Sequence, residues 1–296
     1  MRFDRDDATA PRITSTLSSP TQPQLAHILN AKRMVLQSGR AVAMAVLPSR
    51  YATGLVAWSK WFLGEPEMRL LPLLCSRELV AVDIGANTGV YSWHLRRYSR
   101  LVHAYEPIPD LAEGLRRALP ECVVHQYALS DHAGMATLSI PVFDRARINA
   151  LASLSRTFED AEAVRTVEVS VQCLDDEGLG DVGFVKIDVE GHEEAVLVGA
   201  RRLLATQHPT LLVEIDERQT PGAIQRVVTL LESLDYDAYF LDKGRMRPIG
   251  AFDPSTMQSS SAISADGWAT SAFIANFVFV PSQPVWHGQR KVIEPA

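Results

Sequence analysis

The sequence predicts an α/β protein with a doubly wound, mostly parallel sheet, helices on both faces and an N-terminal helical cap. From Val80 onwards, short apolar runs that suit buried strands alternate with segments of helical periodicity. Glycines or carboxylates follow several of these runs, where open α/β sheets bind ligands. With 296 residues and 47% hydrophobic content, the chain is long enough to bury one large core.

The expected organisation has four parts. Residues 1–23 are rich in Ser, Thr, Pro and Asp without a hydrophobic centre, which predicts a disordered tail rather than a secretory signal. Residues 24–75 form the helical cap, 76–285 the α/β domain and 286–296 a C-terminal tail. In the cap we expect helices over 24–47 and 51–74, the second broken by Gly64 and Pro66.

Composition restricts the partners and the compartment. A formal net charge of -6 argues against a general nucleic-acid binder and favours a small or uncharged molecule as the partner, a class that includes a small-molecule or glycan acceptor. The three cysteines are far apart and form no C-x-x-C pair, so we expect reduced thiols and a cytoplasmic protein. The apolar stretch Ala41–Leu47 is far shorter than the ~18 residues of a membrane span. We therefore expect no membrane-spanning helix.

The stretch VAVDIGANTGVYS, residues 80–92, predicts a buried strand, a tight turn and the start of a helix. Glycines in such a turn permit positive φ, and the free N–H groups of the helix point into the same space. Asn87 and Val90 replace the second and third glycines of the dinucleotide fingerprint. Asp83 would repel a phosphate, so a positively charged ligand suits this turn better. S-adenosylmethionine carries an ammonium and a sulfonium, and D-x-G-x-x-x-G resembles the first motif of methyltransferases that use it.

The next two predicted strands also end in polar residues. Leu101–Tyr105 is followed by Glu106, where an acid in nucleotide-binding sheets accepts hydrogen bonds from ribose hydroxyls. A third strand over 123–129 ends at Ser130 and Asp131. A carboxylate there either accepts a hydrogen bond from an adenine amino group or forms an ordinary Asx turn, and both readings stay open.

An insertion interrupts the alternation after the third strand. Strands are expected over 136–140 and 166–171. The polar segment between them contains Arg145, Arg147, Asn149, Ser153 and Ser155. Insertions at the carboxyl edge of a sheet usually shape substrate pockets, so we expect this segment to wall the acceptor site.

The second informative stretch is FVKIDVEGHEE, residues 184–194. A strand with alternating charges, Lys186, Asp188 and Glu190, reaches its edge before the turn at Gly191. Charges this close to a core need a partner or a function. One continuous helix, with Val196, Gly199, Ala200, Leu203 and Leu204 on one face, is expected next.

The remaining elements continue the α/β pattern. A strand over 210–215 bears Glu214, and the following helix is expected to use Thr220 as its N-cap. Two more strands are expected over 237–241 and 273–280, the last of them antiparallel. The serine-rich connection over 250–271 is long enough to be a lid or a disordered loop.

The order and spacing of these motifs resemble the FkbM-family methyltransferases over residues 65–281. The resemblance rests on VDIGANTGVYS, HAYEP, YALSDHAG, ALASLS, FVKIDVEGHEEAVLVGA, LLVEI and NFVFVP. It implies a Rossmann-like class I methyltransferase domain that uses S-adenosylmethionine for O-methylation, often of sugar or natural-product hydroxyls. By this resemblance the methionine part of the cofactor contacts Asp83, Gly85, Asn87 and Gly89, the ribose contacts Glu106, and the adenine side contacts Ser130 and Asp131.

Methyl transfer to an aliphatic hydroxyl needs in-line placement and a group that takes the proton. His192 titrates near neutral pH and follows the acidic edge, so it is the expected base. Asp188, Glu190 and Glu214 form an alternative Mg²⁺ site, which we do not favour. We expect the acceptor oxygen over Asp188, His192 and Glu214, with proton removal by a base, a metal or positioning alone left open.

Two other functions compete with O-methylation. An RNA methyltransferase on the same fold needs a continuous basic face and base-stacking aromatics, against which the net acidity counts. A non-catalytic cofactor-binding module has no need for the charges over 188–193. Cytosine-C5 and amino-group methylation are disfavoured, because no cysteine follows a proline and no N-P-P-Y-like segment is present.

Overall fold

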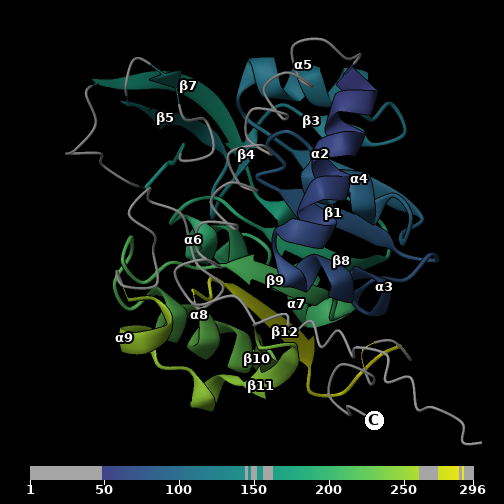
Figure 1. Cartoon of the computed structure of the whole chain (residues 1–296), viewed down its shortest axis with the longest axis vertical. Coiled ribbons are helices and arrows are strands. Elements are labelled where there is room, and N and C mark those ends of the chain that lie inside the picture. Colours follow the sequence, from purple (N-terminus) through teal and green to yellow (C-terminus); the bar gives the residue numbers. More distant parts are fainter. Residues whose placement is uncertain are drawn as a thin grey trace, which may run out of the picture. The chain divides into compact units, whose positions relative to one another are not determined.

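The computed structural model describes residues 49–143, 146–147, 152–155, 163–259, 273–286 and 289, and its strands form two sheets (Figure 1). The predicted tail 1–23 and helix 24–47 lie outside the described residues, as do Arg145, Asn149 and most of the C-terminal tail. The first sheet contains β1 (Val80–Ile84), β2 (Leu101–Tyr105), β3 (Val123–His125), β8 (Val182–Ile187), β9 (Thr210–Glu214), β10 (Tyr236–Asp242), β11 (Arg245–Pro248) and β12 (Asn276–Pro281).

The strand order of the first sheet is β11-β10-β12-β9-β8-β1-β2-β3. Strands β3, β2, β1, β8 and β9 run parallel to one another, while β12 runs antiparallel between β9 and β10, and β11 is antiparallel to β10. The sheet confirms the predicted doubly wound, mostly parallel class and the antiparallel last strand. Strand order reverses at β1, between β2 and β8, so the carboxyl ends of β1 and β8 lie at the switch point where such sheets bind ligands.

The second sheet has the order β4-β7-β5-β6 and was not predicted as a sheet. It contains β4 (Ala128–Leu129), β5 (Gly134–Phe143), β6 (Ala146–Arg147) and β7 (Ala163–Gln172). In Figure 1 the β5–β7 hairpin lies at the upper left, away from the strands of the first sheet. The predicted single strand over 123–129 is wrong. Only 123–125 pair with β2, and Ala128 and Leu129 instead pair with β7. Ala128 packs against side chains of the β5–β7 hairpin, whereas Leu129 joins the core on the α6–α8 face of the first sheet.

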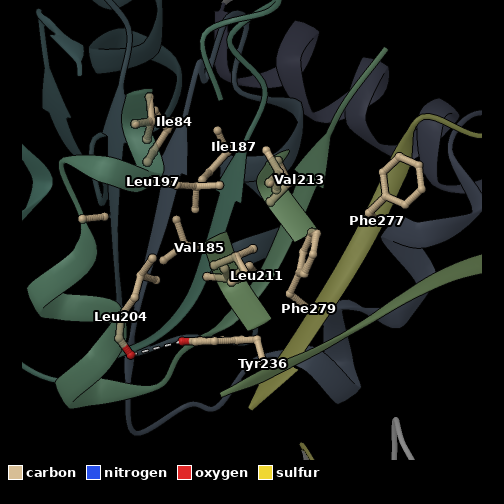
Figure 2. Close-up of a cluster of buried hydrophobic side chains, with 14 of the residues drawn as sticks. Ile84, Val185, Ile187, Leu197, Leu204, Leu211, Val213, Tyr236, Phe277 and Phe279 are labelled. Atoms are coloured by element: carbon tan, nitrogen blue, oxygen red, sulfur yellow. Dashed lines mark hydrogen bonds between the residues drawn. The ribbon is translucent and has the colours of Figure 1, made fainter. Parts of the chain in front are cut away.

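One face of the first sheet is covered by α6 (Glu193–Val198), α7 (Arg201–Gln207) and α8 (Ala223–Glu232). Figure 2 shows the apolar layer between them, in which Ile187 and Val213 of the sheet lie near Leu197 of α6. Tyr236 closes the layer at the other end, and its hydroxyl donates to the carbonyl of Leu204 at 3.4 Å (Figure 2). The helical residues that face the sheet are largely the apolar positions that the sequence pattern predicted.

Two predicted features of these helices are wrong. The single helix over 193–204 is two helices, with Gly199 and Ala200 between them. Gly199 packs so closely that a Cβ there would lie 1.9 Å from the carbonyl oxygen of Ser130. Helix α8 begins at Ala223 with Gly222, not Thr220, as its N-cap. The carboxylate of Glu217 accepts the N–H groups of Gly222 and Ile224 at 2.6 Å each, so it satisfies the donors that Thr220 was expected to satisfy.

The other face is covered by α2 (Ser49–Leu63), η1 (Pro66–Leu70), α3 (Leu71–Leu74), α4 (Val90–Leu95) and α5 (Pro109–Ala118). Three short elements pack instead against the core on the α6–α8 face: η3 (Leu174–Asp176), η4 (Ile249–Ala251) and α9 (Pro254–Met257). Helix α2 ends just before Gly64, consistent with the break predicted there. In the ranges that the structure describes, no helix is both long and apolar enough to cross a membrane.

Candidate active site

The turn after β1 is built from three residues in the left-handed region. Gly85, Asn87 and Gly89 have φ angles of 78°, 50° and 83°. A Cβ at Gly85 would lie 1.8 Å from the carbonyl oxygen of Asp188, so only glycine lets the ends of β1 and β8 come together here. The N–H of Asp188 also donates to the carbonyl of Ile84 at 3.0 Å. The two most informative stretches of the sequence therefore meet at the switch point.

Glu106 fixes this turn to the end of β2. Its carboxylate accepts the backbone N–H groups of Asn87 at 2.8 Å and Ile108 at 2.9 Å. Burial raises the pKa of Glu106 to about 7, although both hydrogen bonds oppose that shift. Each carboxylate oxygen has a second lone pair, so the side chain can still accept from a ligand hydroxyl. Its expected role as ribose ligand stays a prediction.

Asp83 lies beneath the turn rather than at its open rim. Its side chain is 2% exposed, and Oδ2 accepts a hydrogen bond from the Ser92 hydroxyl at 2.5 Å. Burial raises the pKa of Asp83 to about 6. In the β1–β8 register Asp83 is the partner of Lys186, which places both side chains on the same face of the sheet.

Lys186 is a site residue that the sequence prediction missed. It is fully buried, and its Nζ lies 3.6 Å from Asp188 Oδ2 and 3.7 Å from Glu214 Oε2. The same ammonium lies 5.0 Å from the ring centroid of Tyr91. Burial by itself would lower the pKa of Lys186, but Asp188, Glu214 and two further carboxylates raise it above its usual value. The signal in the sequence was a lysine on the same face as Asp188, two residues before it.

Glu65 reaches this group from the cap, between α2 and η1. The Tyr91 hydroxyl donates to Glu65 Oε2 at 2.6 Å, and Lys60 Nζ lies 3.3 Å from Glu65 Oε1. Burial favours the protonated form of Glu65, yet Lys60 and Lys186 together hold its pKa below the usual value. No local pattern marks Glu65 in the sequence. We call Lys186 with the four carboxylates that act on it, Glu65, Asp83, Asp188 and Glu214, the carboxylate cluster.

Glu214 is the member of the carboxylate cluster with the strongest preference for its protonated form. The negative charge of Asp188, followed by burial, raises the pKa of Glu214 well above its usual value. The side chains of Asp188 and Glu214 are each 35% exposed, whereas that of Lys186 beneath them is 1% exposed. The two carboxylates thus present oxygen atoms at the edge of the sheet above a buried cation.

His192 contacts a different part of the edge. Its Nε2 lies 2.9 Å from the Ser130 hydroxyl, and its Nδ1 lies 2.6 Å from the Ser155 hydroxyl. Burial lowers the pKa of His192, which favours the neutral ring at neutral pH. The structure therefore brings Asp188 and Glu214 together around Lys186, and joins His192 to the end of β4 and to the insertion.

The expected adenine-side residues differ in exposure. Ser130 is 1% exposed, and its hydroxyl lies between His192 and Asp131, donating to Asp131 Oδ1 at 3.1 Å. The side chain of Asp131 is 47% exposed and lies 2.6 Å from His132 Nδ1. The hydrogen bond from His132 is the main reason that the pKa of Asp131 is lowered. Asp131 is thus an ionised surface carboxylate beside a buried hydroxyl.

Metal ligation has limited support in the described ranges. No group of three or more His, Cys, Asp or Glu side chains there is arranged to hold a metal ion. Of the three carboxylates considered for Mg²⁺, Asp188 and Glu214 flank the ammonium of Lys186. A positive charge already lies between two of the three expected ligands.

This sheet, with one antiparallel strand inserted beside β9 and an acidic edge at its switch point, is that of a Rossmann-like class I methyltransferase. Residues 83–238 match the family described as the methyltransferase FkbM domain. The chain belongs to the FkbM methyltransferase family. The 31-O-demethyl-FK506 methyltransferase FkbM of Streptomyces tacrolimicus is 32% identical over 184 residues, covering 51% of this chain and 70% of that protein.

Solved structures give weaker similarity. Methyltransferase FkbM from Methylobacillus flagellatus KT is 16% identical with a TM-score of 0.45, and the match covers 86% of this chain and 60% of that chain. This chain thus spans less than two thirds of that protein. An rRNA methylase from Streptococcus thermophilus is 9% identical with a TM-score of 0.40, covering 74% of this chain and 95% of that chain. At these TM-scores neither structure bears on the acceptor.

Proposed function

We propose that this protein is an S-adenosylmethionine-dependent O-methyltransferase that acts on a hydroxyl of a sugar, glycolipid or natural product. Membership of a methyltransferase family supports the cofactor. The name of the Streptomyces relative, a 31-O-demethyl-FK506 methyltransferase, supports transfer to an oxygen of a natural product. The observation that carries the proposal for this chain is the carboxylate cluster.

The carboxylate cluster fits a cationic ligand. With Glu214 protonated and the other groups ionised, three carboxylates and one ammonium leave a formal charge of -2 in a largely buried site. Such a site repels a pyrophosphate and attracts a ligand with an ammonium and a sulfonium. When bound, S-adenosylmethionine supplies the methyl group. In this proposal its methionine part binds at Asp83, Gly85, Asn87 and Gly89, its ribose at Glu106, and its adenine near Ser130 and Asp131.

In this proposal the acceptor oxygen lies over Asp188 and Glu214. Asp188 takes the hydroxyl proton, and Lys186 beneath it holds the carboxylate in place through their 3.6 Å contact. Glu214 keeps its own proton because its pKa is raised, so it can donate a hydrogen bond to the acceptor oxygen. The alternative of a Mg²⁺ bound by Asp188, Glu190 and Glu214 predicts instead that a chelator abolishes turnover and that Mg²⁺ restores it.

His192 acts as a positioning residue in this scheme. Both of its ring nitrogens are engaged by serine hydroxyls, and these bonds join the end of β4 to the insertion that is expected to wall the acceptor site. His192→Asn should retain part of the turnover, whereas His192→Ala should lower kcat about tenfold or more and leave cofactor affinity nearly unchanged. If activity lost in His192→Ala returns as pH rises, His192 is the base and Asp188 is not.

The cofactor proposal is tested with Asp83→Asn. Removing one buried negative charge should weaken S-adenosylmethionine binding about 10- to 100-fold in calorimetry, because hydrogen bonds and contacts with charged groups contribute about 1.5–3 kcal/mol. The pKa of Asp83 is about 6, so wild-type affinity should rise as pH increases through that value. The variant should lack this rise. Asp237→Asn, an exposed change on β10, is the matched control.

Two results would contradict the cofactor proposal. Equal affinity of wild type and Asp83→Asn at every pH would separate the carboxylate cluster from the cofactor. Binding heat with a nicotinamide dinucleotide and none with S-adenosylmethionine would replace the cofactor altogether.

A further inference from the structure

The connection between β7 and β8 carries a carboxylate that two tyrosines share. Glu177 follows η3 directly, and its Oε2 accepts hydrogen bonds from the hydroxyls of Tyr105 at 3.0 Å and Tyr127 at 2.7 Å. Tyr105 is the last residue of β2, and Tyr127 follows β3, the strand at one edge of the first sheet. Residues from three separate parts of the chain therefore meet at one oxygen atom beside this edge.

Two histidines extend this contact along the sheet. Tyr127 Oη lies 3.0 Å from His125 Nδ1, and His125 Nε2 lies 3.0 Å from His103 Nδ1. The His125 ring also stacks on that of Tyr105, with centroids 4.4 Å apart. Burial lowers the pKa of His103 and of His125, which favours neutral rings at neutral pH. We call these five residues the Glu177 network: His103, Tyr105, His125, Tyr127 and Glu177.

One arrangement of protons satisfies every contact in the Glu177 network. Tyr127 donates to Glu177, so its oxygen accepts from the Nδ1–H of His125. The Nε2 of a neutral His125 then carries a lone pair, and it accepts from the Nδ1–H of His103. Each hydrogen bond in the chain thus points towards the carboxylate of Glu177, which is the final acceptor. Removal of that acceptor leaves both tyrosine hydroxyls without their partner.

The backbone of the same residues holds two parts of the proposed cofactor site. The Tyr105 carbonyl accepts the N–H of Gly85, in the turn after β1, at 3.0 Å. The His125 carbonyl accepts the N–H of Glu106, the expected ribose ligand, at 3.0 Å. Glu177 therefore fixes the side chains of Tyr105 and, through Tyr127, of His125, whose carbonyls hold the turn and the ribose ligand.

We propose that Glu177 is a positioning residue for cofactor binding, which holds the ends of β2 and β3 so that Glu106 faces the ribose hydroxyls. This inference rests on the proposed function, because it takes S-adenosylmethionine as the ligand of the turn after β1. A binding group must be held within about 0.5 Å of its productive geometry, and support from behind provides this precision. Affinity for the cofactor is then the property that depends on Glu177.

The position of the Glu177 network separates it from the edge assigned to the acceptor. The network lies at β2 and β3, whereas Asp188 and Glu214 lie at the ends of β8 and β9, on the other side of β1. Loss of Glu177 should therefore raise the KM for S-adenosylmethionine and leave kcat at saturating cofactor nearly unchanged.

The test is calorimetry with S-adenosylhomocysteine and with its 2′,3′-dideoxy analogue. Glu177→Ala should weaken binding of S-adenosylhomocysteine about tenfold, because Glu106 no longer meets the ribose hydroxyls in the correct geometry. The analogue has no such hydroxyls, so wild type and Glu177→Ala should bind it with affinities within about twofold of each other. A merely structural defect would weaken the binding of both ligands alike.

A conservative change and a matched control accompany this test. Glu177→Gln keeps a carbonyl oxygen that both tyrosine hydroxyls can reach, so it should retain most of the affinity. Asp176→Ala removes the preceding carboxylate, whose side chain is 64% exposed and forms a surface pair with Arg202 at 3.5 Å. This control should bind both ligands like wild type.

Tyr127→Phe provides the same comparison with a smaller change in the protein. Tyr127 is partly exposed, and the variant loses only its hydroxyl, so it should fold even if Glu177→Ala does not. Its affinity for S-adenosylhomocysteine should fall between those of wild type and Glu177→Ala, and its affinity for the dideoxy analogue should stay unchanged.

Two results would overturn the inference and leave the proposed function intact. The first is equal affinity of wild type, Glu177→Ala and Tyr127→Phe for S-adenosylhomocysteine. The second is an equal loss of affinity for S-adenosylhomocysteine and the dideoxy analogue, which would make the role of Glu177 structural only. Failure of wild type to bind S-adenosylhomocysteine would instead contradict the proposed function itself, and the inference with it.

Discussion

The two faces of the first sheet differ in what they bury at the carboxyl ends of the strands. Towards α6, α7 and α8, the strands stay apolar to their ends, as with Ile84, Ile187 and Val213 in Figure 2. Towards α4 and the cap, Ala81, Phe184 and Leu212 are apolar, but two positions further along each strand stand Asp83, Lys186 and Glu214. One face is an apolar core along the whole length of its strands, whereas the other carries the charged side chains of the candidate site at the carboxyl ends of its strands.

This contrast identifies the part of the fold in which buried groups reduce stability instead of adding to it. Burying apolar area stabilises the fold by about 25 cal/mol per Å², whereas removing charges from water costs several kcal/mol per ion unless they are paired. Burial raises the pKa of Asp83 to about 6, and the negative charge of Asp188, followed by burial, raises that of Glu214 well above its usual value. Such groups concentrate at functional sites because catalysis and ligand binding use them.

The largest effect is expected from Lys186→Met, which removes the cation from the charged face. Carboxylates left without their partner should lower the free energy of unfolding by about 3–5 kcal/mol at pH 8. The loss should shrink at pH 5, because Asp83, with a pKa of about 6, is then protonated and Glu214 holds its proton as well. Denaturant unfolding at both pH values measures this difference.

Lys243→Met is the control for that change, since Lys243 is exposed in the turn between β10 and β11 and its substitution should change the free energy of unfolding by less than about 0.5 kcal/mol. An equal loss for Lys186→Met at pH 5 and pH 8 would mean that packing, not charge, explains its role.

On the apolar face, Leu211→Ala should lower the free energy of unfolding by about 2–5 kcal/mol through loss of burial and a cavity. Leu211 is fully buried among apolar side chains, so the effect should be independent of pH. The protein that remains folded should keep its turnover. Met135→Ala, at a position 62% exposed, should change stability by less than about 0.5 kcal/mol. A loss of stability in Leu211→Ala that varied with pH would contradict this difference between the two faces of the sheet.

The smallest effect is expected from Glu67→Gln, in the part of the cap that packs on the charged face. Burial raises the pKa of Glu67 from 4.5 to about 7. The folded state therefore favours the protonated carboxyl: its contribution to stability is complete below pH 4.5 and is lost as pH rises through about 7. Glu67→Gln should stabilise the protein by about 1–3 kcal/mol at pH 8 and hardly at pH 5. Thermal unfolding of wild type and variant at the two pH values measures this difference. A variant less stable than wild type at pH 8 would contradict the prediction.

Local patterns accounted for the class of the fold and for much of the edge of the site. The apolar runs predicted β1, β2, β8, β9 and β12, and the glycines predicted the left-handed turn after β1. These features depend on residues within a few positions of one another, so they can be read along the chain. The family followed from motifs of the same kind and is confirmed. The roles of the individual site residues stay predictions.

Prediction from the sequence failed where the pairing or packing partner of a segment is distant along the chain. The strand over 123–129 divides between two sheets because β7, some forty residues later, offers Ala128 and Leu129 a better partner. Gly199, at the end of α6, packs against Ser130, and no nearby residue signals that contact.

The sequence by itself determined which residues stand at the carboxyl ends of the strands, and it identified Asp83, Asp188 and Glu214 among them. Only the tertiary structure decided their partners: Lys186 lies under Asp188 and Glu214, Glu65 arrives from the cap, and His192 binds Ser130 and Ser155. The physical reason is the distance along the chain over which each kind of interaction acts. Strand and turn preferences act between neighbours along the chain, whereas the partner of a buried charge depends on which distant strand ends and helices the packing of the whole domain brings together.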